Sequence, residues 1–113
     1  MGGIVRYKGE LDGIVLGVLQ AGPAHGYEIV KRVHLISEGA LSVGEAKLYP
    51  CLHKLEDEGC VSAEWFPQEG KPSRKVYSLT SKGAGLLAEK RKAWERFADG
   101  VGSVLNAGEV FHG

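Results

Sequence analysis

The 113-residue sequence lacks several features, and each absence excludes a class of protein or site. It contains only two cysteines, Cys51 and Cys60. Their spacing is not that of metal ligands, and no second cysteine pair completes a zinc site, so we expect reduced thiols and no metal site. No run of about 18 apolar residues is present, so no membrane-spanning helix is expected. Residues 1–8 lack the apolar core of a signal peptide, and we therefore expect a cytoplasmic protein.

Catalytic motifs are missing as well. The sequence contains no nucleophile elbow, no phosphate-binding P-loop and no His-Glu-x-x-His zinc motif. Glycine is plentiful, with 17 residues, but the glycines of the C-terminal third do not form the dinucleotide-binding fingerprint. We therefore expect no catalytic residues, no cofactor and no enzyme activity.

An excess of charge of either sign is also absent. The 14 Lys and Arg residues balance 14 Asp and Glu residues, whereas a nucleic-acid-binding protein is often basic overall. The charges are unevenly distributed, however, because the stretch from Lys71 to Lys82 contains four cations and no acid, while acids gather at Glu56-Asp57-Glu58. A local basic stripe can attract phosphate without a basic total charge.

The length and the apolar pattern indicate one small domain that is mainly helical. A chain of this length buries only a modest core, so a partner subunit would stabilise it. Apolar residues at helical spacing predict helices over about residues 10–20, 27–37, 46–58 and 81–105. Residues 1–8 and 106–113 show no clear pattern, and we expect a loose arm and a flexible tail.

The third predicted helix has two distinct faces. Leu48, Leu52 and Leu55 recur at helical spacing and form its apolar face, and Gly59 after it is typical of a helix end. Ser42 is a candidate for the residue that caps its start. The opposite face carries a cationic pattern made by Lys47, Cys51 and Lys54.

Two strand-like segments follow this helix and predict a β-hairpin. Residues 61–65 alternate between apolar and polar, and residues 74–80 do so more weakly. The basic segment between them, residues 67–73, is too long for a tight two-residue turn. A short helix with a cationic face followed by a basic hairpin is the arrangement of a winged helix-turn-helix.

The sequence therefore predicts a mainly α fold with a small β-hairpin. We expect a winged helix-turn-helix DNA-binding domain at residues 1–80, a long C-terminal dimerisation helix at 81–105 and a tail at 106–113. The residues expected to be buried together are Leu11, Ile14, Val15, Val18, Leu48, Leu52, Leu55, Trp65, Tyr77 and Leu79.

The fourth predicted helix carries an apolar seam. Trp94, Phe97, Val101 and Val104 follow the alternating spacing of a coiled coil, which favours a homodimer through this helix. Burial at the seam is the simplest role for Trp94 and Phe97. Paired aromatic rings at a symmetric interface would also form a flat slot for a planar ligand.

These segments together resemble the PadR family of bacterial transcriptional regulators. The matching parts are Gly22–Tyr27 (the family's G-x-x-x-G-Y turn), Leu48–Gly59 (its L-Y-P-x-L-x-x-L-E-x-x-G), Trp65, and Arg74–Gly83 (its R-K-x-Y-x-L-T-x-x-G). The resemblance covers about residues 11–105. One departure is Lys47, because the family usually has Thr before its Leu-Tyr-Pro.

The resemblance implies a homodimeric regulator of the family's small form, with a single C-terminal helix, that represses a nearby promoter and is released by an effector or by changed conditions. Some members hold planar aromatic compounds, so a planar aromatic or phenolic effector is also allowed. The residues expected to meet double-stranded DNA are Lys47, Tyr49, Cys51, His53, Lys54, Lys71, Ser73, Arg74 and Lys75.

Some of these expectations have alternatives. Tyr49 and His53 lie between the two faces of their helix, so each is a candidate for packing or for DNA contact. His25 is expected to serve the turn rather than a ligand. The alternative to a DNA-binding regulator is a winged-helix protein-interaction module without DNA binding, which the zero net charge would fit.

Overall fold

The computed structural model describes residues 3–4 and 8–108, and it contains four helices and a small antiparallel sheet within them. The helices are α1 (Lys8–Gln20), α2 (Gly26–Ile36), α3 (Glu45–Asp57) and α4 (Ser81–Leu105). The strands are β1 (Gly3–Ile4), β2 (Ala24–His25), β3 (Leu41–Ser42), β4 (Val61–Gln68) and β5 (Lys71–Leu79). The predicted winged helix-turn-helix with a long C-terminal helix is confirmed.

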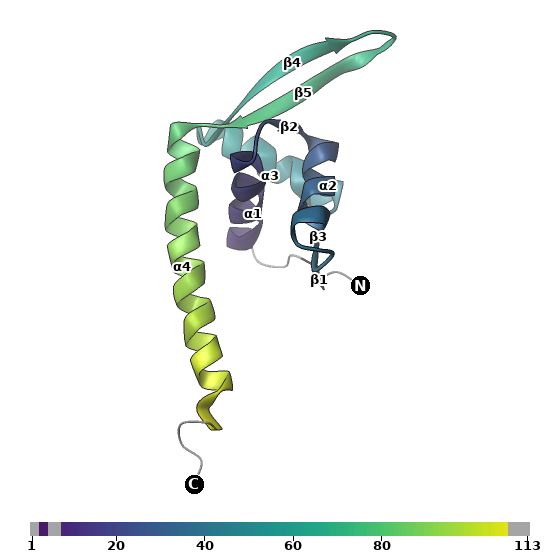
Figure 1. Ribbon diagram of the computed structural model, residues 1–113. Helices are drawn as coiled ribbons and strands as arrows, with labels where there is room; N and C mark the ends of the chain where they lie inside the picture. Colours follow the sequence, from purple (N-terminus) through teal and green to yellow (C-terminus); the bar gives the residue numbers. More distant parts are fainter. Residues whose placement is uncertain (1–2, 5–7, 109–113) are drawn as a thin grey trace.

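Helices α1, α2 and α3 form a compact group, and β4 and β5 extend from it as a long hairpin (Figure 1). Strand β5 lies between β2 and β4, with antiparallel pairing on both sides, so the hairpin is joined to the start of α2. Helix α4 packs on α1 and then continues away from the domain. The loose arm predicted for residues 1–8 and the tail predicted for 106–113 lie mostly outside the described residues.

The core confirms most of the predicted apolar positions. The fully buried large side chains are Val15, Leu16, Ile29, Leu48, Leu52, Leu55, Val61 and Tyr77. Val18 is also buried, and Leu11, Ile14 and Leu79 are partly buried against the same cluster. The apolar stripe of α3 therefore faces the core, as its periodicity predicted.

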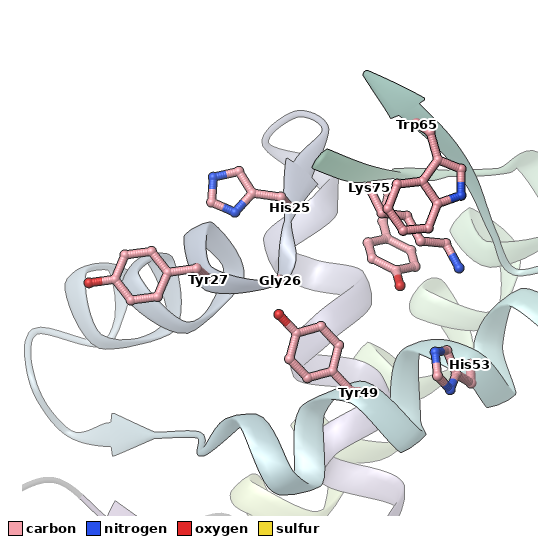
Figure 2. Close-up of a pocket in the computed structure, with 8 residues that line it drawn as sticks. His25, Gly26, Tyr27, Tyr49, His53, Trp65 and Lys75 are labelled. Carbon is pink, nitrogen blue, oxygen red and sulfur yellow. The ribbon is translucent and has the colours of Figure 1, made fainter. Parts of the chain in front are cut away.

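The burial predicted for Trp65 is wrong, because 66% of its surface is exposed. Alternation along β4 does place it on the same side as Val61, which is buried. The indole lines a pocket between the wing and α3 instead of packing in the core, so most of its surface remains exposed (Figure 2). The sequence predicted which face of β4 carries Trp65, but it did not predict how far other elements pack over that face.

Two local predictions were also wrong. Ser42 does not cap α3, because it lies in β3 and the N-cap position is Gly44, which makes no side-chain hydrogen bond. The hairpin tip is shorter than residues 67–73, since only Glu69 and Gly70 separate the strands and Gly70 has a positive φ of 70°. Pro67 is accommodated within β4 at a register shift, where the missing N–H does not interrupt the ladder.

The start of α4 is fixed against the segment that follows α3. The Thr80 hydroxyl accepts a hydrogen bond from the Gly83 backbone N–H (3.0 Å) and donates one to the Gly59 carbonyl (2.7 Å). Gly83 lies so close to the Cys60 carbonyl that an added Cβ would be 2.0 Å from its oxygen. Glycine at this position lets the long helix leave the domain in the observed direction.

Replacing Gly83 with alanine is therefore expected to destabilise the fold by about 1–3 kcal/mol, because the first turn of α4 must shift away from Cys60. Gly85→Ala is the matched control, since nothing lies within 4 Å of its Cβ position. It should stabilise the fold by about 0.5–1 kcal/mol, because alanine has the higher helix propensity. Urea unfolding followed by circular dichroism compares the two, and equal stabilities would contradict the close contact at Gly83.

Candidate nucleic-acid interface

Helix α3 exposes a continuous surface on the side away from the core. Its exposed residues are Glu45, Ala46, Lys47, Tyr49, Pro50, His53, Lys54 and Asp57. By helical spacing, Ala46, Pro50 and His53 lie at the centre of this surface, while Lys47 and Lys54 lie along the edge next to α1. The cations predicted on the outer face are therefore on its flank, and the centre line of Ala46, Pro50 and His53 continues at the same helical spacing to the acidic Asp57.

The predicted contact of Cys51 with DNA is not compatible with the structure. Cys51 is only 7% exposed, and its Sγ donates a hydrogen bond to Asp12 Oδ1 at 3.2 Å. The sequence placed it on the outer face, but α1 covers that side of α3. Burial, together with the hydrogen bond to Asp12, raises the pKa of the Cys51 thiol to about 12, so the group stays protonated and is a weak nucleophile at neutral pH.

Lys54 forms an ion pair with Asp12 of α1, and the distance from Lys54 Nζ to Asp12 Oδ2 is 2.6 Å. Asp12 is the one charged residue that is buried within the described part of the chain. The hydrogen bond to its carboxylate raises the pKa of the Lys54 ammonium. Sequence reasoning missed Asp12, although an acid among the apolar residues of the first helix was a signal that a partner lies opposite.

Lys75 of β5 is held in a similar way at the base of the wing. Its Nζ lies 3.0 Å from Glu56 Oε1 and is placed over the rings of Trp65 (5.8 Å) and Tyr77 (5.3 Å). The hydrogen bond to Glu56 raises the pKa of this ammonium as well. The lysine thus connects the hairpin to α3, and the exposed indole of Trp65 covers it.

The tip of the wing presents free cations. Lys71, Ser73 and Arg74 are exposed. The Gln68 amide, oriented with its oxygen toward Arg74, accepts hydrogen bonds from Nε (2.8 Å) and Nη2 (3.0 Å) of the guanidinium. Among the described residues, neither Lys71 nor Arg74 forms an ion pair, and the same holds for Lys47 on α3.

A shallow pocket of about 380 Å³ separates the wing from the helices, and Figure 2 shows its lining. The lining residues are His25, Gly26, Tyr27, Tyr49, His53, Trp65, Lys75 and Tyr77. The Tyr49 hydroxyl points toward Gly26, where an added Cβ would lie 2.5 Å from the oxygen. The glycine of the G-x-x-x-G-Y turn therefore allows Tyr49 to lie against the start of α2.

His25 has the turn role that the sequence predicted. Its Nδ1 accepts a hydrogen bond from the Glu28 backbone N–H (3.3 Å), and the residue is the N-cap of α2. Burial, with a further effect from Arg74, lowers the pKa of His25. A lowered pKa keeps the ring neutral near pH 7, which is the form that can accept this hydrogen bond.

The far half of α4 carries the predicted apolar seam, and it is uncovered in the single chain. The exposed fractions are 56% for Trp94, 62% for Phe97, 40% for Val101 and 74% for Val104. The rings of Trp94 and Phe97 lie 5.9 Å apart between centroids and are tilted by 38°. Such a row of exposed apolar side chains is typical of a protein interface. Within the described residues, no helix is long and apolar enough to cross a membrane.

Comparisons with known proteins agree with this architecture. The family model described as "Transcriptional regulator PadR-like family" matches residues 15–89. A PadR family transcriptional regulator from Eggerthella lenta DSM 2243 is 34% identical, with a TM-score of 0.73, and the match covers 87% of this chain and 83% of that one. Bacillus subtilis PadR, crystallised in complex with operator DNA, is 32% identical with a TM-score of 0.65, over 70% of this chain and 45% of that one.

A curated relative is similar over a comparable region. Transcriptional regulator YqjI from Escherichia coli strain K12 is 27% identical over 93 residues, which cover 82% of this chain. The same match covers 43% of the length of YqjI, so this chain corresponds to less than half of that protein.

Proposed function

Because this chain belongs to the PadR-like family of transcriptional regulators, we propose that it is a homodimeric repressor that reads duplex DNA with α3 and holds the backbone with its wing. The observation that carries the proposal is the exposed surface of α3 beside a wing whose tip bears free cations, Lys71 and Arg74. A helix of this size fits the major groove, and a basic hairpin beside it suits phosphate or the minor groove. The similar Bacillus subtilis protein was crystallised with operator DNA.

The proposed contacts divide into two groups. His53, at the centre of the exposed surface of α3, and Tyr49, on its edge toward α2 and the wing, are the candidates for base edges. Lys47, on the edge next to α1, is the candidate for phosphate. Lys71, Ser73 and Arg74 on the wing are the candidates for the sugar-phosphate backbone. All three side chains are exposed, and the two cations form no ion pair within the described residues, which supports a contact with DNA.

Fluorescence anisotropy with duplexes from the gene's own upstream region tests the proposal. Binding to one duplex should be stronger than binding to scrambled duplexes, and the affinity should fall steeply with salt because bound cations displace counterions from DNA. Undetectable binding to any duplex at low salt would instead favour a protein-interaction module of the same fold.

The proposal of a homodimer is supported by the exposed seam of α4. A two-fold partner would bury Trp94, Phe97, Val101 and Val104, and would place the two α3 helices at successive turns of DNA, on the order of 34 Å apart. We place a planar aromatic or phenolic effector at the same seam, since two copies would bring four aromatic rings around the axis. A ligand can shift the angle between the two domains only by preferring one arrangement.

The effector proposal predicts that a planar aromatic compound quenches the fluorescence of Trp94 and lowers the affinity for DNA. The measurement needs a Trp65→Phe background, because the exposed Trp65 on the wing would otherwise contribute to the signal. Quenching that is equally strong after Phe97→Ala, without any change in DNA affinity, would leave Trp94 with a packing role alone.

A further inference from the structure

Two ion pairs within the chain flank the proposed reading helix, one on each side. On the side of α1, Asp12 pairs with Lys54, and on the side of the wing, Glu56 pairs with Lys75. Both lysines were candidates for DNA contact from the sequence. The structure shows instead that the ammonium group of each is paired with a carboxylate of the same chain.

The pair on the α1 side is firmly built. Asp12 is 8% exposed, and both of its carboxylate oxygens are used, Oδ1 by the thiol of Cys51 and Oδ2 by Lys54. A carboxylate with so little access to water is costly to leave unpaired. Lys54 is 49% exposed in its side chain, so the lysine spans from this carboxylate to the open surface of α3.

The pair on the wing side is held by three groups. Glu56 accepts the hydrogen bond from Lys75, and the rings of Trp65 and Tyr77 both lie at cation–π distance from the ammonium. Figure 2 shows Lys75 beside Trp65, above the part of α3 that bears His53. The side chain of Lys75 is 24% exposed, so its ammonium is both neutralised and partly covered.

We propose that Asp12 and Glu56 act as internal substitutes for DNA phosphate, which hold Lys54 and Lys75 and thereby lower the sequence-independent affinity of the chain for DNA. The proposal rests on the DNA-binding function proposed above. A lysine that is already paired with a carboxylate adds no phosphate contact unless that pair breaks, so it displaces no counterions from the duplex.

The arrangement also changes what determines binding. Phosphate contacts increase the affinity for every sequence equally, whereas contacts to base edges distinguish sequences. With Lys54 and Lys75 paired, the cations of α3 and the wing that form no ion pair with the described residues are Lys47, Lys71 and Arg74. The chain's balance of 14 basic and 14 acidic residues is consistent with limited attraction to bulk DNA.

The test uses the isosteric variants Asp12→Asn and Glu56→Gln in the full-length protein, with a scrambled duplex as the probe. Each variant should bind up to about eightfold more tightly at 0.1 M salt, and its slope of log affinity against log salt should steepen by about 0.9, the value for one new phosphate contact. Glu89→Gln is the matched control, because it removes one exposed negative charge from α4 and should leave the slope unchanged.

A second variant separates charge release from a change in folding. Asp12→Asn combined with Lys54→Met should return the slope to the wild-type value, and circular dichroism melting should show that both proteins are folded. The inference would be overturned if both single variants kept the wild-type salt slope or if Asp12→Asn had a shallower slope. An equal gain of affinity in Glu89→Gln would also overturn it. A wild-type protein that binds no duplex would instead overturn the proposed function, and the inference with it.

Discussion

A variant in which Lys47, Lys71 and Arg74 are all replaced by alanine is expected to bind duplex DNA about 500-fold more weakly at 0.1 M salt. Each phosphate contact contributes about 0.9 to the slope of log affinity against log salt, so three lost contacts flatten the slope by about 2.7. The loss should be similar for specific and scrambled duplexes, because phosphate contacts carry no base information. Fluorescence anisotropy at several salt concentrations measures both quantities.

These three side chains are chosen because each is exposed and none forms an ion pair within the described residues. Their removal should therefore leave the core and the domain's stability unchanged. The matched control replaces the three exposed cations Arg91, Lys92 and Arg96 of α4, which removes the same charge far from α3 and the wing. An equal loss of affinity in the control would show that total charge, and not the proposed interface, determines binding.

The second large effect is expected at the seam of α4. Phe97→Asp should convert the protein to a monomer at micromolar concentration and abolish tight binding to DNA that carries two half-sites. In a two-fold dimer each substitution occurs twice, and two lost apolar side chains at about 2 kcal/mol each weaken the dimer on the order of a thousandfold. Analytical ultracentrifugation measures the change in mass.

Ser103→Asp is the control for the seam, because it introduces the same charge on the same helix. By helical spacing, Ser103 lies away from the side that carries Trp94, Phe97 and Val101. It should leave the dimer intact. A wild-type protein that is already monomeric, or a Phe97→Asp variant that remains dimeric, would contradict the proposed interface.

Much of the fold could be predicted because the strongest signals are local. Helix α4 runs from Ser81 to Leu105, the span expected from the sequence, because Thr80 caps its start and no proline interrupts it. The stripe of Leu48, Leu52 and Leu55 is fully buried. The helical repeat of about 3.6 residues places the three leucines on one side of α3, and burial in the core removes their apolar surface from water. The wing was also predicted, although its strands are longer than the alternating pattern indicated.

The candidate site was less predictable, because it depends on what lies opposite each side chain. Helical spacing gave the direction of Cys51 and Lys54 relative to the leucines, but it did not show that α1 covers that flank. The alternation along β4 likewise gave the side of Trp65 without showing that the indole lines a pocket between the wing and α3 instead of the core. Both errors have the same origin. The periodicity of apolar residues shows the direction of each side chain within one helix or strand, whereas burial depends on a second element that packs against it.

The sequence by itself determined the order of the elements, the apolar side of each helix and the motifs that show the family, because these depend on residues close together in the chain. Only the tertiary structure decided which cations are free. Lys54 meets Asp12, 42 residues earlier, and Lys75 meets Glu56, 19 residues earlier, in pairs that form when α1, α3 and the wing pack together. The physical reason is that a lysine forms an ion pair only with a carboxylate that is close to it in space. For Lys54 and Lys75 that distance is set by the packing of elements that are far apart in the sequence.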